Sequence, residues 1–324
     1  MIQRYLPVVV FPIVLLIGAC TVSAQGYPVR PIRILAGQAP GGATDLFARM
    51  IAQKLNDAWK NPVVVENRPG AAGGIAAQLT AQAPPDGYTM LLSTAGQIVI
   101  NPHLTRRLGY DPLKDLVPVA FLTTSPLLLV THPSVPAKSV RELIALAKSH
   151  PNKLNHGSGG SGSPAHLAAE LFKSKAGIKM VHIPFKGVGP SVVALAAGEI
   201  DCTFASVAAT LPLVKAGRLR ALAVSTPKRS QVVPDIPTVA EAGVPGYEVT
   251  TWYGFFGPAA LPGNIVAKLN AEFTRILAMP DVRQRLLHEG AEPGNLTLPQ
   301  FAAFIRADSA RWAKAIKDAG IKAD

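Results

Sequence analysis

The chain contains little cysteine, few aromatic residues and fewer acidic than basic residues. Of the two cysteines among its 324 residues, Cys20 lies in an apolar N-terminal segment, which leaves Cys202 without an intramolecular partner. We therefore predict no disulfide. The apolar neighbours of Cys202 predict a buried thiol on a strand.

The excess of basic residues is spread along the chain. There are 32 Lys and Arg residues against 20 Asp and Glu residues, a formal net charge of +12, and only 6% of the residues are aromatic. Scattered cations with so few aromatic residues argue against nucleic-acid binding. They fit either a general attraction of small anions or simply a soluble basic surface.

The sequence also lacks the usual metal and cofactor motifs. Its seven histidines show no metal-ligand spacing, and a single free cysteine offers no second soft ligand, so we expect no metal. Gly157, Gly159 and Gly162 match the glycine spacing of a dinucleotide fingerprint. The following strand, Met180–Ile183, ends without the acidic residue that would bind a ribose, so we expect no cofactor.

Covalent catalysis would require a serine and a histidine held together. The sequence has no G-x-S-x-G elbow. The remaining candidates lie around the Gly/Ser loop at residues 157–163, where Ser158 or Ser161 could pair with His156 or His166. Packing, capping or ligand contact is the more common role for such histidines. We therefore predict no catalytic residue.

The N-terminus has the pattern of a secretory signal. An apolar run from Leu6 to Ala19 follows Arg4 and precedes the small residues Val22-Ser23-Ala24. We predict that residues 1–24 are a cleaved signal peptide and that the mature protein is periplasmic. The alternative is lipidation of Cys20, because Ile17-Gly18-Ala19-Cys20 resembles a lipobox.

Strands and helices alternate along the rest of the chain, which predicts an α/β fold with a parallel sheet covered on both faces. Strands are expected at Ile32–Leu35, Val63–Glu66, Tyr88–Ser93, Val117–Val130, Met180–Ile183, Ile200–Phe204, Leu219–Val224 and Thr250–Phe256. Helices are expected after Thr44 or Asp45 as the N-cap, through Ile75 and Leu79, at Ser139–Ser149, after the cap Ser163, from Pro190, and at Asn264–Ala278, Asp281–Glu289 and Pro299–Ala319.

Two segments suit crossings between two lobes. Val117–Val130 is extended and is broken by Pro126, and Pro227–Gly246 is rich in proline and turn residues. Trp252 and Tyr253, at the return from the second crossing, are expected to pack at the hinge or in the core, with a place in the cleft as the less favoured alternative.

Five loops rich in glycine follow strands, at residues 37–42, 67–74, 93–96, 157–163 and 186–189. The fourth is a run of only Gly and Ser, after which Ser163 and Pro164 open a helix. Backbone N–H groups and helix dipoles converge at such loops, so we predict an anion site built from amides with no bidentate arginine. Arg68 is expected to form a surface ion pair or to brace the loop. Asp201 is either a loop anchor or a contact to a ligand.

Several ordered motifs, taken together, carry a family resemblance. They are Ala39-Pro40-Gly41-Gly42-Ala43-Thr44-Asp45 with Ala48-Arg49, Val65-Glu66-Asn67-Arg68-Pro69-Gly70-Ala71, Pro85-Asp86-Gly87-Tyr88-Thr89, Gly157 to His166, Leu219 to Val224, Ile236 to Gly243 and Ala291-Glu292-Pro293. Along almost all of its mature length the chain resembles the substrate-binding proteins of tripartite tricarboxylate transporters, the Bug family.

The resemblance implies a type II periplasmic binding-protein fold of two α/β lobes with a ligand cleft between them. We expect lobe 1 at residues 25–125 and 251–324, and lobe 2 at residues 126–250. The loops and the resemblance together predict these ligand-binding residues: Gln38, Pro40, Gly41, Gly42, Asp45, Ser93, Thr94, Ser158, Gly159, Gly160, Ser161, Ser163, His166, Asp201, Phe204 and Ser206. Gln38 stands where many members of the family have an aromatic residue.

The resemblance further implies a non-enzymatic receptor that captures a small organic carboxylate and delivers it to a two-subunit membrane permease. We expect it to act as a monomer and without nucleic acid. The competing classes are a periplasmic ligand sensor that feeds a signalling system and a periplasmic hydrolase that uses serine and histidine.

Overall fold

A computed structural model describes residues 26–105 and 108–318. In this part of the chain one curled, mixed sheet of ten strands has the order β2-β1-β3-β9-β4-β7-β5-β6, with β8 and β10 also paired to β4. The strands are β1 Ile32–Ala36, β2 Val63–Asn67, β3 Thr89–Thr94, β4 Leu116–Thr131, β5 Asn155–Ser158, β6 Val181–Pro184, β7 Cys202–Ser206, β8 Arg220–Val224, β9 Thr250–Pro258 and β10 Glu292–Pro293.

Helices cover both faces of this sheet, as predicted, but the prediction of a parallel sheet was wrong, because β4 runs antiparallel to β7, β8 and β9. The helices are α1 Ala43–Trp59, α2 Gly74–Ala81, α3 Asn101–Leu104, α4 Val140–Ser149, α5 Pro164–Ala176, α6 Val188–Ala196, α7 Val207–Lys215, α8 Gly263–Ala278, α9 Pro280–His288 and α10 Leu298–Asp318. The short turns η2 (Ala71–Gly73, 3₁₀) and η3 (Gly96–Ile100, π) complete the described elements. None of the helices within the described ranges is long and apolar enough to cross a membrane.

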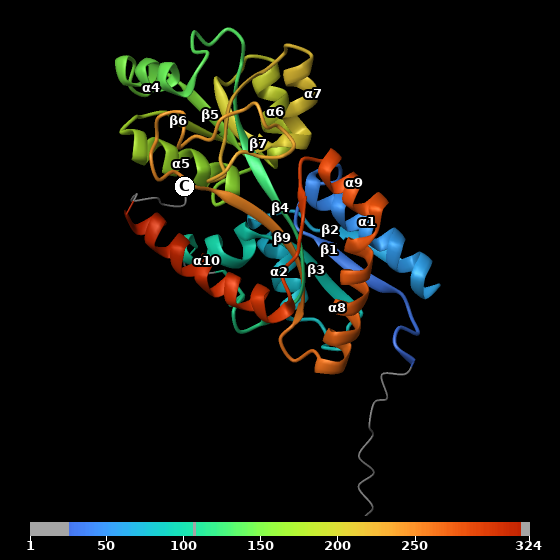
Figure 1. Cartoon of the computed structure of the whole chain (residues 1–324). Coiled ribbons are helices and arrows are strands. Elements are labelled where there is room, and N and C mark those ends of the chain that lie inside the picture. The colour runs from blue at the N-terminus through green and yellow to red at the C-terminus, as the bar shows by residue number, and fades with distance from the viewer. Residues whose placement is uncertain (1–25, 106–107, 319–324) are drawn as a thin grey trace, which may run out of the picture.

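The long strand β4 joins two halves of the molecule (Figure 1). It pairs with β9 as far as Pro126 opposite Thr250, and from Leu127 opposite Ser206 it pairs with β7. Proline has no N–H to donate to the ladder, which is consistent with a change of partner at this point. We call the part built on β1–β3 the first half and the part built on β5–β8 the second half.

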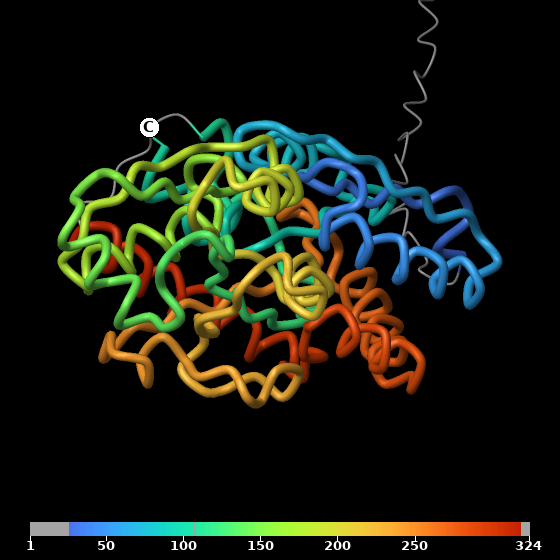
Figure 2. Tube along the Cα trace, turned by 90° about the horizontal axis from the view of Figure 1, so that it is seen from above, coloured from blue at the N-terminus to red at the C-terminus, as the bar shows by residue number. Residues whose placement is uncertain are grey.

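Two apolar cores cover the faces of the first half. Helices α1, α8 and α9 pack on one face around Phe47, Phe255 and Phe273, and α2 and α10 lie on the other, where Trp252 and Phe301 are buried. Alternate residues of β9 therefore face opposite cores, as the two-residue period of a strand requires. Figure 2 shows from above that the blue segments of the first half and the green segments of the second lie at opposite ends of the molecule.

Some elements differ from the sequence-based prediction. The helix predicted from Pro190 begins at Val188, and α7, α3 and β10 were not predicted. Helix α1 begins at Ala43 after Gly42, and no side chain caps it, so the prediction of Thr44 or Asp45 as the cap was wrong. Cys202 is buried and free, as predicted, in the strand β7.

Candidate ligand-binding cleft

A cavity of about 310 Å³ lies between the two halves. Its lining includes residues that follow the carboxyl ends of β1, β6 and β7. Ligands of α/β proteins bind at this end of the strands. The lining consists of Gln38, Ala39, Pro40, Gly41, Gly42, Ala43, Leu46, Lys186, Gly187, Val188, Gly189, Pro190, Ser206, Ala208, Ala209, Tyr253 and Glu289. Of the predicted site residues, Gln38, Pro40, Gly41, Gly42 and Ser206 are in this lining.

The first wall is the loop at residues 37–42, and Asp45 holds its shape. The Asp45 carboxylate accepts the Gly41 N–H at 3.0 Å and pairs with the Arg49 guanidinium at 3.0 Å. Burial raises the pKa of Asp45, but the bonds from Arg49 and Gly41 outweigh it and leave the pKa below its ordinary value. Asp45 is outside the cavity lining. It therefore fixes the loop that carries the wall.

Gln38 is tied into the same loop. Its side-chain oxygen accepts the Thr44 hydroxyl at 3.1 Å, and its backbone carbonyl accepts the Asn67 amide at 3.0 Å. Asn67 in turn accepts from Arg49 at 3.3 Å, so the second glycine-rich loop braces the first without lining the cavity. The neighbouring Arg68 forms an exposed ion pair with Glu66 at 3.0 Å, as predicted.

The opposite wall is the turn before α6 together with the start of α7. Gly187 occupies the N-cap of α6 with φ +118°, a backbone conformation that glycine adopts readily. Ser206 caps α7 by accepting the Ala209 N–H at 3.4 Å. Two helix N-termini thus line this side of the cleft, opposite the start of α1, and their N–H groups favour an anion between them.

The Gly/Ser loop lies behind this second wall. A Cβ placed on Gly159 would come within 3.2 Å of the Val188 backbone nitrogen, and Phe185 N–H donates to the Ser158 carbonyl at 3.1 Å. Ser163 caps α5 as predicted, accepting the His166 N–H at 3.3 Å. None of Ser158, Gly159, Gly160, Ser161, Ser163 or His166 lines the cavity.

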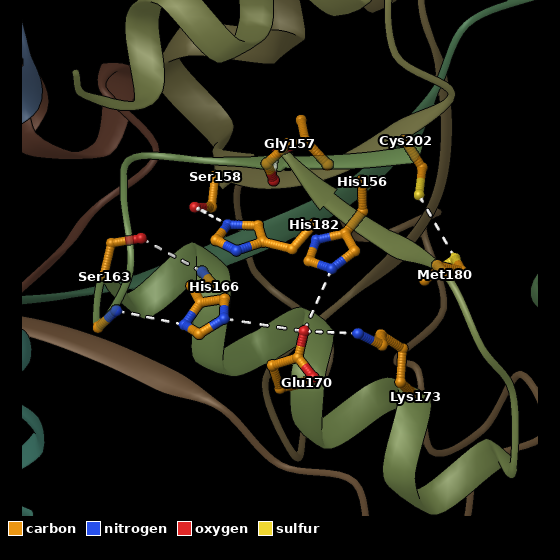
Figure 3. A network of polar contacts seen from close by, with 12 residues as sticks. His156, Gly157, Ser158, Ser163, His166, Glu170, Lys173, Met180, His182 and Cys202 are labelled. Atoms are coloured by element: carbon orange, nitrogen blue, oxygen red, sulfur yellow. Dashed lines mark hydrogen bonds and ion pairs between the residues drawn. The ribbon is translucent and has the colours of Figure 1, made fainter. Parts of the chain in front are cut away.

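Three stacked imidazoles support the Gly/Ser loop from below (Figure 3). The His182 ring lies between those of His166 and His156, with ring centroids 4.2 and 4.9 Å away. Ser158 Oγ is 2.6 Å from His182 Nε2 and accepts the Gly160 N–H, while His166 Nδ1 accepts the Gly162 N–H. The serine–histidine contact thus forms with His182. His182 was not among the histidines that the sequence analysis considered for a serine–histidine pair, which were His156 and His166.

Glu170 links two of these histidines from the next turn of α5. Its Oε1 lies 3.2 Å from His156 Nε2, 3.8 Å from His166 Nε2 and 2.7 Å from Lys173 Nζ. Burial raises the pKa of Glu170, but the bonds from His156 and Lys173 outweigh it and lower the pKa to about 2. Burial lowers the pKa of His156, which its bond to Glu170 offsets only in part. The pair is therefore a neutral imidazole in contact with a carboxylate, with Lys173 as the cation.

The other predicted site residues have structural contacts. Ser93 and Thr94 are buried at the end of β3, where both donate to Gln97 Oε1. Asp201 accepts the Asn155 N–H at 2.6 Å, which matches the loop-anchor alternative. Phe204 is 1% exposed and packs against Phe172 and Tyr247, so its side chain lies in the core outside the cavity lining.

Three polar or charged side chains that line the cleft, those of Lys186, Tyr253 and Glu289, were not among the predicted site residues. Lys186 lies in a loop that was predicted to matter, but the residue itself was not singled out. Tyr253 packs in the core as predicted and also lines the cleft, which was the less favoured alternative, and Glu289, which pairs with Arg285 at 2.7 Å, follows α9 with no motif around it. Lys186 and Glu289 had only a positional signal, because each follows the end of an element that reaches the cleft, whereas Tyr253 lies within β9. Within the described ranges no cluster of residues suits a metal ion.

The profile of the family described as "Tripartite tricarboxylate transporter family receptor" matches residues 47–321. The chain belongs to this family. Protein BugT of Bordetella pertussis is 37% identical over 305 residues, which cover 94% of each chain. The resemblance that the sequence motifs carried is therefore confirmed, and so are the predicted fold class and the assignment to receptors rather than enzymes.

Solved structures of two relatives share the fold of this receptor. Rpa4515 of R. palustris, described with adipate, is 38% identical with a TM-score of 0.88, covering 91% of this chain and 99% of its own. MatC (Rpa3494) from Rhodopseudomonas palustris, described with bound malate, is 34% identical with a TM-score of 0.85. The match covers 90% of this chain and 100% of the MatC chain. The receptor thus has a solute-binding role, and the family supports an extracytoplasmic location.

Proposed function

We propose that this receptor captures a small organic carboxylate in the cleft between its halves and delivers it to a two-subunit membrane permease of the tripartite type. The observation that carries the proposal is the lining of the cleft, where the starts of α1, α6 and α7 face one cavity. N–H groups at helix starts bind anions without a side-chain cation. Relatives described with adipate and with malate support the same ligand class.

In this proposal the two halves act as lobes, with boundaries near Pro126 and Thr251. The ligand's carboxylate contacts the backbone of residues 38–42 on one wall and of residues 186–190 on the other, together with Ser206. Lys186 is exposed, and no ion pair is found for it among the described residues. Its ammonium group adds positive potential at the cleft and draws anions toward it. The Gly/Ser loop and Asp45 support the two walls from outside the cavity.

Isothermal titration calorimetry tests the ligand class. Mono-, di- and tricarboxylates of different chain lengths are compared with the uncharged amides of the same acids. We expect at least one acid to bind in the micromolar range or tighter, and its amide to bind at least 100-fold more weakly. Failure of every acid in the presence of a correctly folded chain would contradict the proposal.

Export is part of the same proposal. We infer that signal peptidase cleaves after Ala24, in the segment before the described residues, and that the mature chain starts at Gln25 in the periplasm. Mass spectrometry of the protein from a periplasmic fraction measures this directly. A diacylglyceryl mass on Cys20 would instead mean a membrane-anchored receptor.

A further inference from the structure

Tyr253 lines the cleft although it is only 6% exposed. It lies in β9, in register with Thr94 of β3 and Thr123 of β4. Its ring meets the Phe47 ring edge-on, with centroids 5.0 Å apart and an angle of 88° between the planes. A central strand and a buried aromatic partner thus hold this side chain at a fixed place in the cleft.

The hydroxyl of Tyr253 differs from those of the other buried tyrosines. Tyr27 donates to the Gly87 carbonyl at 2.6 Å, Tyr110 to the Gln97 carbonyl at 2.7 Å and Tyr247 to the Ala168 carbonyl at 3.0 Å. The Tyr253 hydroxyl has no hydrogen-bond partner among the residues that the structure describes. Since Tyr253 lines the cleft, the partner expected for its hydroxyl is whatever occupies the cleft.

The surroundings of Tyr253 favour a ligand group that accepts a hydrogen bond. Burial raises the pKa of Tyr253 to about 12, so its hydroxyl remains a neutral donor at neutral pH. Much of the remaining lining is small or apolar, as at Leu46, Val188 and Ala208, which limits the alternative partners for such a group. A ligand that placed only methylene groups against the hydroxyl would leave a desolvated donor without an acceptor.

We propose that Tyr253 is a specificity-determining residue, which donates a hydrogen bond to a second oxygen-bearing group of the bound organic acid. The cleft then selects acids with a second acceptor, such as a distal carboxylate, over simple alkyl monocarboxylates. This inference rests on the proposed function, because it assumes that the walls at residues 38–42 and 186–190 hold the first carboxylate. Strand β9 then carries the residue that determines which carboxylates bind.

The test measures affinity by calorimetry for pairs of acids of equal chain length, such as adipate with hexanoate and succinate with butyrate. We expect the wild-type protein to prefer the diacid of at least one pair. Tyr253→Phe should weaken binding of that diacid about 10- to 100-fold, the range for a hydrogen bond to a charged group, and change the monoacid less than about 3-fold. Phenylalanine at the neighbouring positions 255 and 256 indicates that this strand accepts the ring.

Tyr88→Phe is the matched control. The Tyr88 hydroxyl accepts the Val29 N–H at 3.0 Å and lies outside the cleft lining, so its loss should leave both affinities unchanged. Equal losses for diacid and monoacid in Tyr253→Phe would mean that Tyr253 contacts the shared carboxylate. That result would overturn the inference. So would an unchanged diacid affinity in Tyr253→Phe, or a wild-type protein that binds the monoacids as tightly as the diacids. Failure of every acid to bind the wild-type protein would contradict the proposed function itself.

Discussion

Asp45 shows how a single side chain defines the first wall of the cleft. It accepts the Gly41 N–H and pairs with Arg49, so the loop is fixed by one carboxylate in two interactions. We predict that Asp45→Ala weakens ligand binding about 10-fold or more, because both interactions are lost. Asp45→Asn keeps an acceptor for Gly41 and should lose less. Calorimetry measures both variants, with Asp57→Ala, an exposed partner of Gln53, as the control.

His156 and Glu170 should make the stability of the protein depend on pH in two separate pH ranges. The pKa of His156 lies below the ordinary 6.5, so below about pH 6.5 the folded state binds fewer protons than the unfolded chain. The free energy of unfolding therefore decreases as the pH is lowered. The pKa of Glu170 is about 2 against an ordinary 4.5. Its contribution is therefore present above pH 4.5 and is lost as the pH falls from about 4.5 to 2.

Two variants should separate these two pH ranges. His156→Gln reduces the decrease that begins near pH 6.5, and His103, whose pKa burial also lowers, accounts for part of what remains. Glu170→Gln flattens the decrease below pH 4.5 and costs about 1–3 kcal/mol at neutral pH, because His156 and Lys173 lose their shared partner. Urea unfolding at a series of pH values measures both effects. His150→Gln, which changes an exposed imidazole, should give the wild-type profile, and a wild-type profile in His156→Gln would contradict the assignment.

At the scale of the element, the turn at the start of α1 depends on a glycine that faces open space. Gly41 has φ +83°, and a Cβ there would meet no atom within 4 Å. Gly217 has φ +70° and equally open surroundings, but follows α7 outside the cleft lining. Valine at either position should destabilise the fold by about 1–2 kcal/mol through the left-handed backbone.

Only Gly41→Val should also lose ligand binding, by at least 10-fold, because its branched side chain enters the cleft. Calorimetry and urea unfolding on both variants separate strain from obstruction. Full affinity in Gly41→Val would mean that the ligand approaches from another wall. The comparison with Gly217→Val makes that result interpretable, since the backbone strain is matched.

Sequence patterns predicted the helices and strands better than they predicted which loops contact one another. Strands followed by glycine-rich turns are local signals, so β1, β3, β6 and the cap at Ser163 could be found from the sequence. The placement of the Gly/Ser loop behind Val188 is a tertiary contact between separate loops, and no local pattern encodes it. Tyr253 follows the buried Trp252, and only the alternation of β9 between two cores sends its side chain to the cleft side.

At the scale of the whole molecule, the two halves share β4 and also touch through two loops that lie outside the cleft lining. Gly96, in the turn after β3, lies against the Gly/Ser loop of the second half. A Cβ on Gly96 would be 3.4 Å from Pro164 Cδ and 3.7 Å from the Gly162 carbonyl oxygen. The same Cβ would be 3.3 Å from Thr94 Oγ1, so the site is already tight for a single methyl group.

We predict that Gly96→Leu holds the halves apart. Gly96 has helical backbone, which leucine can adopt, but its Cβ would crowd Thr94 Oγ1 at 3.3 Å and its outer carbons would press on Pro164 and Gly162. Because bound ligand needs both walls, affinity should fall at least 10-fold, and small-angle X-ray scattering with saturating ligand should show a larger radius of gyration than for the wild type. Gly263→Leu, at the open start of α8, is the matched control and should change neither quantity. Wild-type affinity and radius in Gly96→Leu would mean that the ligand-bound protein does not use this contact.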